Sequence, residues 1–284
     1  MNWQYTPLVL PLIIAAAISA GLAFYSWKRR PTVGTTPFAL LMLAVAEWSL
    51  VYALRLGSVD LSAKIFWARV RYLGIVIVPT AWLAFVLQYT GREKWLTARN
   101  VAILAIEPLV TLLLVWTNDA HHLIWSDIRL EATGSLVVWS AAHGTGFWAH
   151  AGYTYLLLLF GIALLIQAFV RSSRLYRVQT GVLLIGALVP LVGDVLSTYD
   201  LISFPLDLTP FAFTIAGLTV AWGIFRFRLF DIVPVARSAV VDSMGGGVLV
   251  LDVHNRIVDI NPAAQNIIGR PASEVVGQPI AQIL

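Results

Sequence analysis

Cysteine is absent from this chain of 284 residues, and lysine occurs only at Lys28, Lys64 and Lys94. Without cysteine the chain can form no disulfide, no cysteine-ligated metal site and no thiol nucleophile. Because residues 95–284 contain no lysine, a retinal Schiff base in the last apolar segment is excluded. The sequence also contains no glycine-rich phosphate loop. These absences exclude thiol enzymes, P-loop nucleotide hydrolases and rhodopsins of the usual kind.

Charged residues are scarce. They make up 12% of the chain, whereas a soluble domain carries about 25%. Hydrophobic residues make up 59%, and many of them fall in runs long enough to cross a hydrocarbon core of ~30 Å, which takes about 20 residues. The net charge of +4 does not indicate nucleic-acid binding, because the basic residues cluster at the ends of the apolar runs. We therefore expect an all-α integral membrane protein.

The apolar runs predict a bundle of seven transmembrane helices. The predicted spans are Pro7–Ser26, Thr36–Leu56, Ala63–Tyr89, Val101–Thr117, Trp148–Val170, Val178–Thr198 and Thr209–Phe227.

The basic residues predict the orientation of this bundle. Four junctions between spans carry three lysine or arginine residues each, and with seven spans all four lie on one side. They are Lys28/Arg29/Arg30, Arg92/Lys94/Arg99, Arg171/Arg174/Arg177 and Arg226/Arg228/Arg237. Basic residues mark the cytoplasmic side, so the N-terminus is expected outside and the C-terminus in the cytoplasm. Met1–Thr6 has no basic residue, which favours a permanent first span over a signal peptide.

The second outer loop, Asn118–Phe147, is longer than the other two outer loops and is rich in aromatic residues. Two alternating stretches, "HLIWSDIRL" and "SLVVWS", flank "EATG". This pattern predicts a β-hairpin that turns near Gly134. Long loops with their own structure are often functional, so we expect the hairpin to cover the outer mouth of the bundle.

Charged residues inside a span are costly unless they are paired or hydrated, so they mark candidate ligand-binding positions. Glu47 lies near the middle of its span, and Arg69, Arg71 and Asp194 lie in the outer third of theirs. Arg69 and Arg71 are about 200° apart on a helix, so only one can face Asp194, and we expect one such pair. The alternatives are a polar floor under a ligand pocket and a salt bridge that fixes the bundle geometry.

Aromatic and histidine residues gather near the outer surface. Trp125 and Trp148 are further candidate ligand-binding residues, although interfacial belts of tryptophan and tyrosine are also common. Four histidines lie near acidic residues outside the membrane, but their spacing is not diagnostic of a metal site. They are His121, His122, His143 and His150. Metal binding, pH sensing and simple packing are the alternatives, and we predict no metal, no cofactor and no catalytic residue.

The end of the chain reads as a soluble segment. The stretches "GVLVLD" and "RIVDIN" predict two strands. Asn261 is a good helix N-cap and Pro262 suits the first helical position, while Gly269 can end that helix. Pro271 begins a second helix. Residues Met244–Leu284 resemble the first half of a PAS domain. Two strands cannot form an independent sheet, so we expect an incomplete copy of that domain.

The membrane part also resembles a known family. The stretches "FWARVRYLG", "LQYTGRE", "TNDAHHLIW", "RVQTGVLLIGALVPLVGDVL" and "FRFRLFDIVPVAR", taken in order, are similar to the seven-helix N-terminal region of bacterial sensor histidine kinases. In that family a PAS domain and a kinase core usually follow the bundle. The resemblance implies three parts: a transmembrane sensor over residues 1–232, a linker helix over 233–245 and the PAS segment over 246–284.

The expected function is therefore a sensory receptor module in the bacterial cytoplasmic membrane. It would bind a small molecule or lipid-like ligand, form a homodimer and pass the signal to a kinase core and a response regulator, with no nucleic-acid partner. Residues 1–284 contain no ATP-binding domain, so we expect no kinase activity from them. The alternatives are the same sensor with another output such as a diguanylate cyclase, a small-solute transporter with a regulatory tail, and a scaffold that senses the bilayer.

Overall fold

The computed structural model describes residues 3–30, 32–133, 136–172, 174–199, 201, 206–227, 241, 243–252 and 255–283. The chain forms two compact units, Met1–Asp231 and Ile232–Leu284. Most of the predicted linker helix, residues 233–245, lies outside the described residues.

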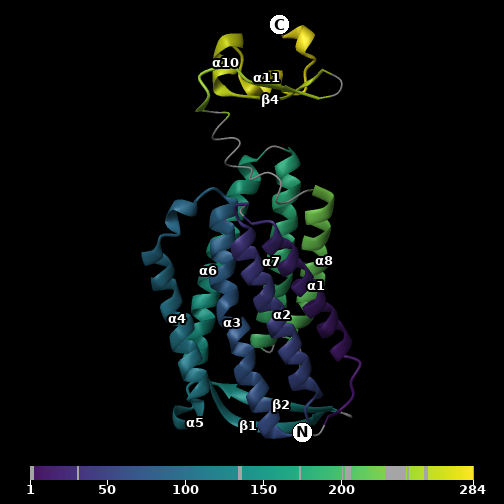
Figure 1. Ribbon diagram of the computed structural model, residues 1–284, viewed down its shortest axis with the longest axis vertical. Helices are drawn as coiled ribbons and strands as arrows, with labels where there is room; N and C mark the ends of the chain where they lie inside the picture. Colours follow the sequence, from purple (N-terminus) through teal and green to yellow (C-terminus); the bar gives the residue numbers. More distant parts are fainter. Residues whose placement is uncertain are drawn as a thin grey trace. The chain divides into compact units, whose positions relative to one another are not determined.

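The first unit is a bundle of seven long helices (Figure 1). They are α1 Val9–Lys28, α2 Thr35–Gly57, α3 Leu61–Tyr89, α4 Ala98–Trp116, α6 Thr145–Arg171, α7 Arg174–Thr198 and α8 Thr209–Phe227. Among the described residues, six of these helices are long and apolar enough to cross a membrane, and α8 is the shorter exception. The helices occupy the seven predicted spans, and their ends lie within a few residues of the predicted ends. Two short helices, η1 Glu93–Trp95 and α5 Asn118–His121, lie before and after α4.

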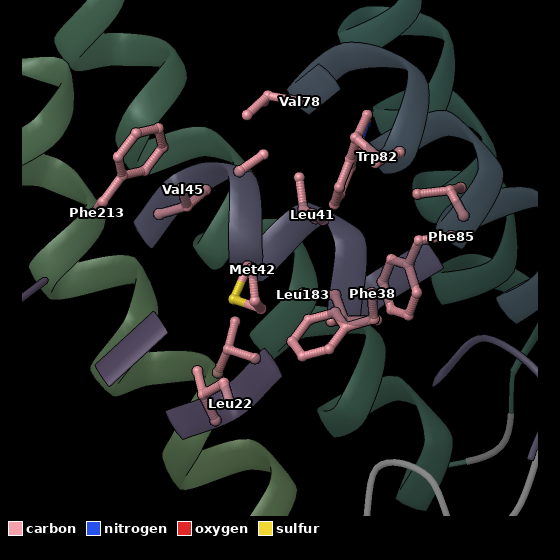
Figure 2. Close-up of a cluster of buried hydrophobic side chains, with 14 of the residues drawn as sticks. Leu22, Phe38, Leu41, Met42, Val45, Val78, Trp82, Phe85, Leu183 and Phe213 are labelled. Carbon is pink, nitrogen blue, oxygen red and sulfur yellow. The ribbon is translucent and has the colours of Figure 1, made fainter. Parts of the chain in front are cut away.

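The core of the bundle is a cluster of buried apolar side chains from every long helix except α4 (Figure 2). Phe38, Trp82 and Phe85 form adjacent ring contacts within it. Leu183 of α7 and Phe213 of α8 contribute from the second half of the chain. The helices are apolar on all sides. One face of each packs into the core, and the opposite face carries exposed leucine, isoleucine and valine.

Helices α2 and α3 approach each other closely at Gly74, in the middle of α3. A Cβ atom placed there would clash with the Ala44 carbonyl and the Glu47 carboxylate of α2. The absence of a side chain at Gly74 therefore sets the separation of the two helices.

The predicted hairpin is confirmed. Strands β1 Trp125–Thr133 and β2 Leu136–His143 pair antiparallel, with Trp125 opposite His143 and Thr133 opposite Leu136. The register shifts between Ser126 and Arg129, where the backbone of Asp127 has φ 53°, as in a β-bulge. The predicted turn, at residues 134–135, lies outside the described residues. Figure 1 places both strands across the end of the bundle where α3 and α6 begin.

The second unit, taken by itself, contains the strands β3 Leu249–Leu251 and β4 Ile257–Ile260, paired antiparallel. They are followed by α10 Pro262–Ile268, α11 Ala272–Val275 and η2 Ile280–Gln282. The Asn261 side chain accepts a hydrogen bond from the Ala264 amide, and Gly269 ends α10 with φ 72°. The helix signals read from the sequence are therefore confirmed. A small core of Ile257, Ile260, Ala264 and Val275 holds the elements together.

Candidate ligand-binding cavity

A cavity of about 580 Å³ lies inside the bundle beneath the hairpin. Its walls come mainly from α2, α3, α6, α7 and α8, and residues 138–143 of β2 contribute at the hairpin end. Small-molecule sites typically have volumes of about 300–1,000 Å³. The cavity is therefore large enough to enclose a small ligand.

The two ends of the cavity differ in chemistry. Toward the hairpin it is lined by charged and hydrogen-bonding residues, which we call the polar mouth: Arg55, Arg71, His150, Tyr155, Asp194 and Asp207. Toward the opposite ends of the helices it is lined by apolar residues, which we call the apolar floor: Phe38, Met42, Val45, Trp82, Leu183 and Phe213. Figure 2 shows these floor residues converging from α2, α3, α7 and α8.

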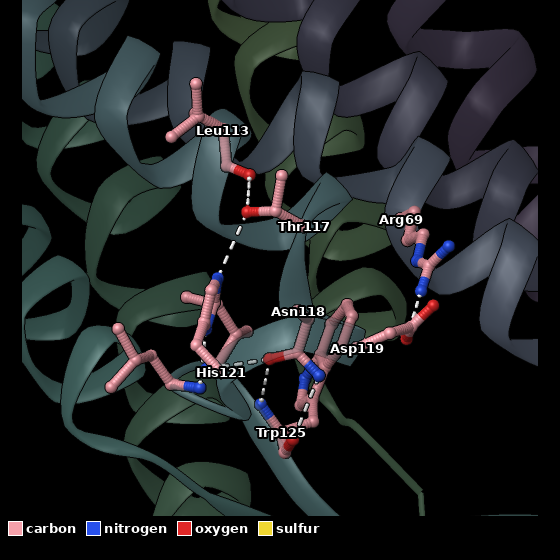
Figure 3. Close-up of polar contacts among 9 residues, drawn as sticks. Arg69, Leu113, Thr117, Asn118, Asp119, His121 and Trp125 are labelled. Atoms are coloured by element: carbon pink, nitrogen blue, oxygen red, sulfur yellow. Dashed lines mark hydrogen bonds and ion pairs between the residues drawn. The ribbon is translucent and has the colours of Figure 1, made fainter.

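Asn118 holds one end of the hairpin (Figure 3). Its side-chain oxygen accepts hydrogen bonds from the backbone amides of Ile124 and Trp125, at 2.9 and 3.1 Å. Its side-chain nitrogen donates to the Trp125 carbonyl at 2.9 Å. Asn118 is 1% exposed, so these bonds are shielded from water and fix the point where β1 begins.

Gln4 holds the other strand. Its side-chain nitrogen donates to the Val137 carbonyl at 3.0 Å, and its side-chain oxygen accepts from the Val137 amide at 2.9 Å. The same nitrogen donates to the Leu56 carbonyl near the end of α2 at 2.7 Å. The N-terminal segment thus ties β2 to α2 and fastens the hairpin over the polar mouth.

The central feature of the polar mouth is a cluster around Tyr52. Arg71 forms an ion pair with Asp207 at 3.0 Å. The Arg55 and Arg71 guanidinium carbons lie 5.0 and 5.4 Å from the centre of the Tyr52 ring, within the range of cation–π attraction. The Asp207 amide donates to the Tyr52 hydroxyl at 2.9 Å. The cluster joins α2 and α3 to the segment that enters α8.

Asp194 forms a second polar group on the cavity wall. One carboxylate oxygen accepts a hydrogen bond from the Tyr155 hydroxyl at 2.7 Å, and the other accepts from Thr209 at 3.4 Å. Asp194 thus links α6, α7 and the start of α8. The expected ion pair between Asp194 and an arginine is wrong, because Arg71 pairs with Asp207, which lies closer to it across the bundle.

Arg69 and Arg71 take different partners, as their positions around α3 require. Arg69 forms an ion pair with Asp119 at 2.5 Å (Figure 3), and Asp119 is 77% exposed. Arg71 faces the cavity, whereas Arg69 is not among the lining residues. Of the two arginines, therefore, only Arg71 is placed to meet a ligand in this cavity.

The other predicted ligand-binding residues differ in whether they line the cavity. Trp125 is 3% exposed and lines the cavity, where its ring meets Tyr72 and Trp139. Trp148 is 42% exposed and does not line the cavity, because α6 turns it outward against Tyr199. Glu47 lies against α3 at Gly74, away from the cavity. Neither of its carboxylate oxygens has a hydrogen-bond partner among the described residues.

Among the described residues, the histidines are not gathered into a metal-binding cluster. His150 is buried in α6, where Nδ1 lies 2.8 Å from the Glu107 carboxylate of α4 and Nε2 lies 3.4 Å from the Thr154 hydroxyl. His121 bonds to Thr117 and to the Leu123 amide at the base of the hairpin. Within the described part of the chain, no group of three or more histidine, aspartate or glutamate side chains is arranged to hold a metal ion.

Sequence reasoning missed Arg55, Tyr52 and Asp207. Arg55 lies next to the end of the second predicted span, and Asp207 lies in the loop before the last span. A tyrosine and an arginine three positions apart on one helix face, as at 52 and 55, are a signal that could have been found. The partnership with Asp207 depends on how the helices pack, which local sequence does not specify.

Comparisons with known proteins bear on both units. A family model described as the N-terminal 7TM region of histidine kinase matches residues 11–234, and the PAS fold matches residues 236–283. A search of curated proteins found no match. A histidine kinase sensor region implies a two-component system, in which a response regulator receives the signal. The chain therefore belongs to the family of N-terminal 7TM regions of histidine kinases, as a multi-pass membrane sensory module followed by a PAS region.

Proposed function

We propose that the seven-helix unit is a receptor that binds a small molecule or lipid-like ligand in the cavity beneath the hairpin. The observation that carries this proposal is the cavity itself, which has a volume of about 580 Å³ and combines a polar mouth with an apolar floor. A bundle built only for stability would fill such a space with side chains, since protein interiors are close-packed. Arg71, Asp194 and Trp125 are the predicted ligand-binding residues that line it.

The proposed orientation places the hairpin outside the cell and the PAS region in the cytoplasm of a bacterium. The support is the distribution of basic residues. The helix ends opposite the hairpin carry Lys28, Arg29, Lys94 and Arg171, and such residues favour the cytoplasmic face. The ligand would then reach the cavity from outside or from the bilayer.

The orientation predicts a labelling pattern. The chain has no cysteine, so a single introduced cysteine is the only target for a maleimide. In intact cells a membrane-impermeant maleimide is expected to label Ala132→Cys in β1 and to leave Lys94→Cys unlabelled until the cells are opened. Both positions are exposed. Labelling of Lys94→Cys alone in intact cells would reverse the orientation.

We further propose that α8 carries the signal toward the PAS region. Asp207 accepts a hydrogen bond from the Thr209 amide at the start of α8, and it pairs with Arg71 of α3. A ligand that changes this ion pair would therefore act on the first turn of α8. The proposed parts are a sensor over residues 1–232, a linker over 233–245 and a PAS segment over 246–284, acting as a homodimer on a kinase core. A ligand drives this switch only through its difference in affinity for the two states.

Filling the cavity tests the proposal. Ala151 of α6 lines the cavity, and a tryptophan at this position would occupy the space beside the polar mouth. We expect Ala151→Trp to abolish the change in phosphorylation of the cognate response regulator across the growth conditions that alter it in the wild type. Phosphorylated and unphosphorylated regulator would be separated on phosphate-affinity gels from cells that express the variant at the native level.

Ala149→Trp is the matched control. Ala149 lies in the same turn of α6 but is exposed and does not line the cavity. This variant is expected to keep the wild-type response. If Ala151→Trp responds as the wild type does while both variants reach the membrane at equal levels, the cavity is not the sensing site.

A further inference from the structure

Arg55 is a cation at the cavity wall that forms no ion pair with any of the described residues. Its guanidinium lies between two aromatic rings, 5.0 Å from the centre of Tyr52 and 5.3 Å from the centre of Trp139 in the hairpin. In the part of the chain that the structure describes, no acidic side chain lies within ion-pair distance of it. Arginine carries five N–H donors and no acceptor, so donors remain for an anionic group.

Arg71 offers a second unused hydrogen-bond donor at the cavity wall. Its Nη1 atom bonds to Asp207, but its Nε atom is buried and has no hydrogen-bond partner among the described residues. Both guanidinium groups contact the same ring, Tyr52. Three carboxylates also line the cavity: Asp207 pairs with Arg71, Asp194 bonds to Tyr155 and Thr209, and Glu131 lies in β1. Among the described residues, none of them forms an ion pair with Arg55.

The rest of the cavity excludes a fully polar ligand. Below the polar mouth the wall is made of aliphatic and aromatic side chains, and Ser19 is the polar residue among them. Burying polar groups there without partners would cost free energy, whereas an apolar chain transferred from water would gain free energy with each CH₂ group buried. The wall therefore favours an apolar chain below an ionic head.

On the basis of the proposed ligand-sensing function, we propose that the ligand is an amphiphile with one anionic head, a carboxylate or phosphate, and a single apolar chain. Arg55 and the free Nε of Arg71 bind the head beneath the hairpin, and the chain extends along the apolar floor. The hairpin also contacts the proposed head-binding group, because the Arg55 guanidinium lies against the ring of Trp139 in β2.

A quenching titration tests this ligand class. Trp82 belongs to the apolar floor, and Trp48 lines the cavity in the same buried cluster, so a bromine at the end of a bound chain quenches their fluorescence. The full chain in phosphatidylcholine nanodiscs would be titrated with 12-bromododecanoate, 12-bromododecanol and 12-bromododecyl-trimethylammonium. We expect saturable quenching by the carboxylate that unbrominated dodecanoate reverses. The alcohol and the cation are expected to bind at least about tenfold more weakly, because hydrogen bonds to charged groups are the strong ones.

Variants of Arg55 identify the head-binding group. Arg55→Gln is expected to weaken 12-bromododecanoate binding by about tenfold or more and to leave binding of the alcohol unchanged. Arg55→Lys keeps the charge and is expected to fall between wild type and Arg55→Gln. Arg129→Gln removes an exposed arginine that pairs with Asp127 outside the cavity, and it is expected to bind as the wild type does. If Arg55→Gln does not fold, the comparison of Arg55→Lys with the wild type still tests whether Arg55 binds the head.

Three results would overturn the ligand class. They are equal binding of the alcohol and the carboxylate, tighter binding of the cation, and an absence of saturable quenching by all three probes. None of these results shows whether the seven-helix unit is a receptor. The response of Ala151→Trp tests that separately. Loss of that response together with any of these three results would mean that the cavity senses a ligand of a different class.

Discussion

Replacing Arg71 by alanine is expected to lower the thermal midpoint of the protein by roughly 10 °C. The substitution leaves Asp207 without its ion-pair partner in a cluster that is mostly shielded from water, and breaking a buried pair costs about 3–5 kcal/mol. For a chain of this size each kcal/mol corresponds to about 2–4 °C. Tryptophan fluorescence or calorimetry in detergent would measure the shift.

The control for Arg71→Ala is the exposed ion pair between Arg129 and Asp127. These side chains are 64% and 74% exposed, and exposed pairs contribute about 0–1 kcal/mol. Arg129→Ala is therefore expected to leave the midpoint nearly unchanged. A double variant, Arg71→Leu with Asp207→Leu, is expected to recover part of the loss, because no charge is then left unpaired. Equal midpoints for Arg71→Ala and Arg129→Ala would show that the buried pair does not hold the bundle together.

Replacing Gly74 by leucine is the second change with a large expected effect. A Cβ atom at this position would overlap the backbone carbonyl of Ala44 and the carboxylate of Glu47, so α2 and α3 must separate. Overpacking usually costs about 1–3 kcal/mol and occasionally more. We expect the upper end, about 3 kcal/mol, because the Ala44 carbonyl belongs to helix backbone and cannot move independently of α2. The same thermal measurement would show it.

Gly152→Leu is the matched substitution in α6. A Cβ at Gly152 meets nothing within 4 Å, and leucine favours helix over glycine by up to about 1 kcal/mol. This variant is expected to keep or slightly raise the midpoint. A similar loss of stability in both variants would assign the effect to leucine itself and contradict the close contact at Gly74.

The helices of the bundle could be predicted because the membrane restricts the choices. A spanning segment must satisfy its own backbone hydrogen bonds, so a long apolar run becomes a helix of matching length. In the second unit, Asn261, Pro262 and Gly269 acted through local backbone geometry that does not depend on distant contacts. The hairpin followed in the same way from alternating residues on either side of Gly134.

The sequence predicted which residue types line the candidate site better than it predicted which residues pair with one another. Arg71 was recognised because a charge within a span requires a partner, but the sequence gives no helix crossing angles. It therefore could not place Asp207, from a short loop, nearer to Arg71 than Asp194. Trp148 was expected beside the cavity from its place at the start of a span, and the rotation of α6 turns it outward. Arg55 was overlooked because its aromatic partner Trp139 comes from a distant strand.

Native mass spectrometry of the protein released from its own membranes tests most directly whether the cavity beneath the hairpin holds a ligand. We expect a bound molecule of small-ligand mass on the wild type and on Ala149→Trp, and its loss from Ala151→Trp. The same adduct on all three proteins, at equal occupancy, would place any bound molecule outside this cavity and contradict the proposed ligand site.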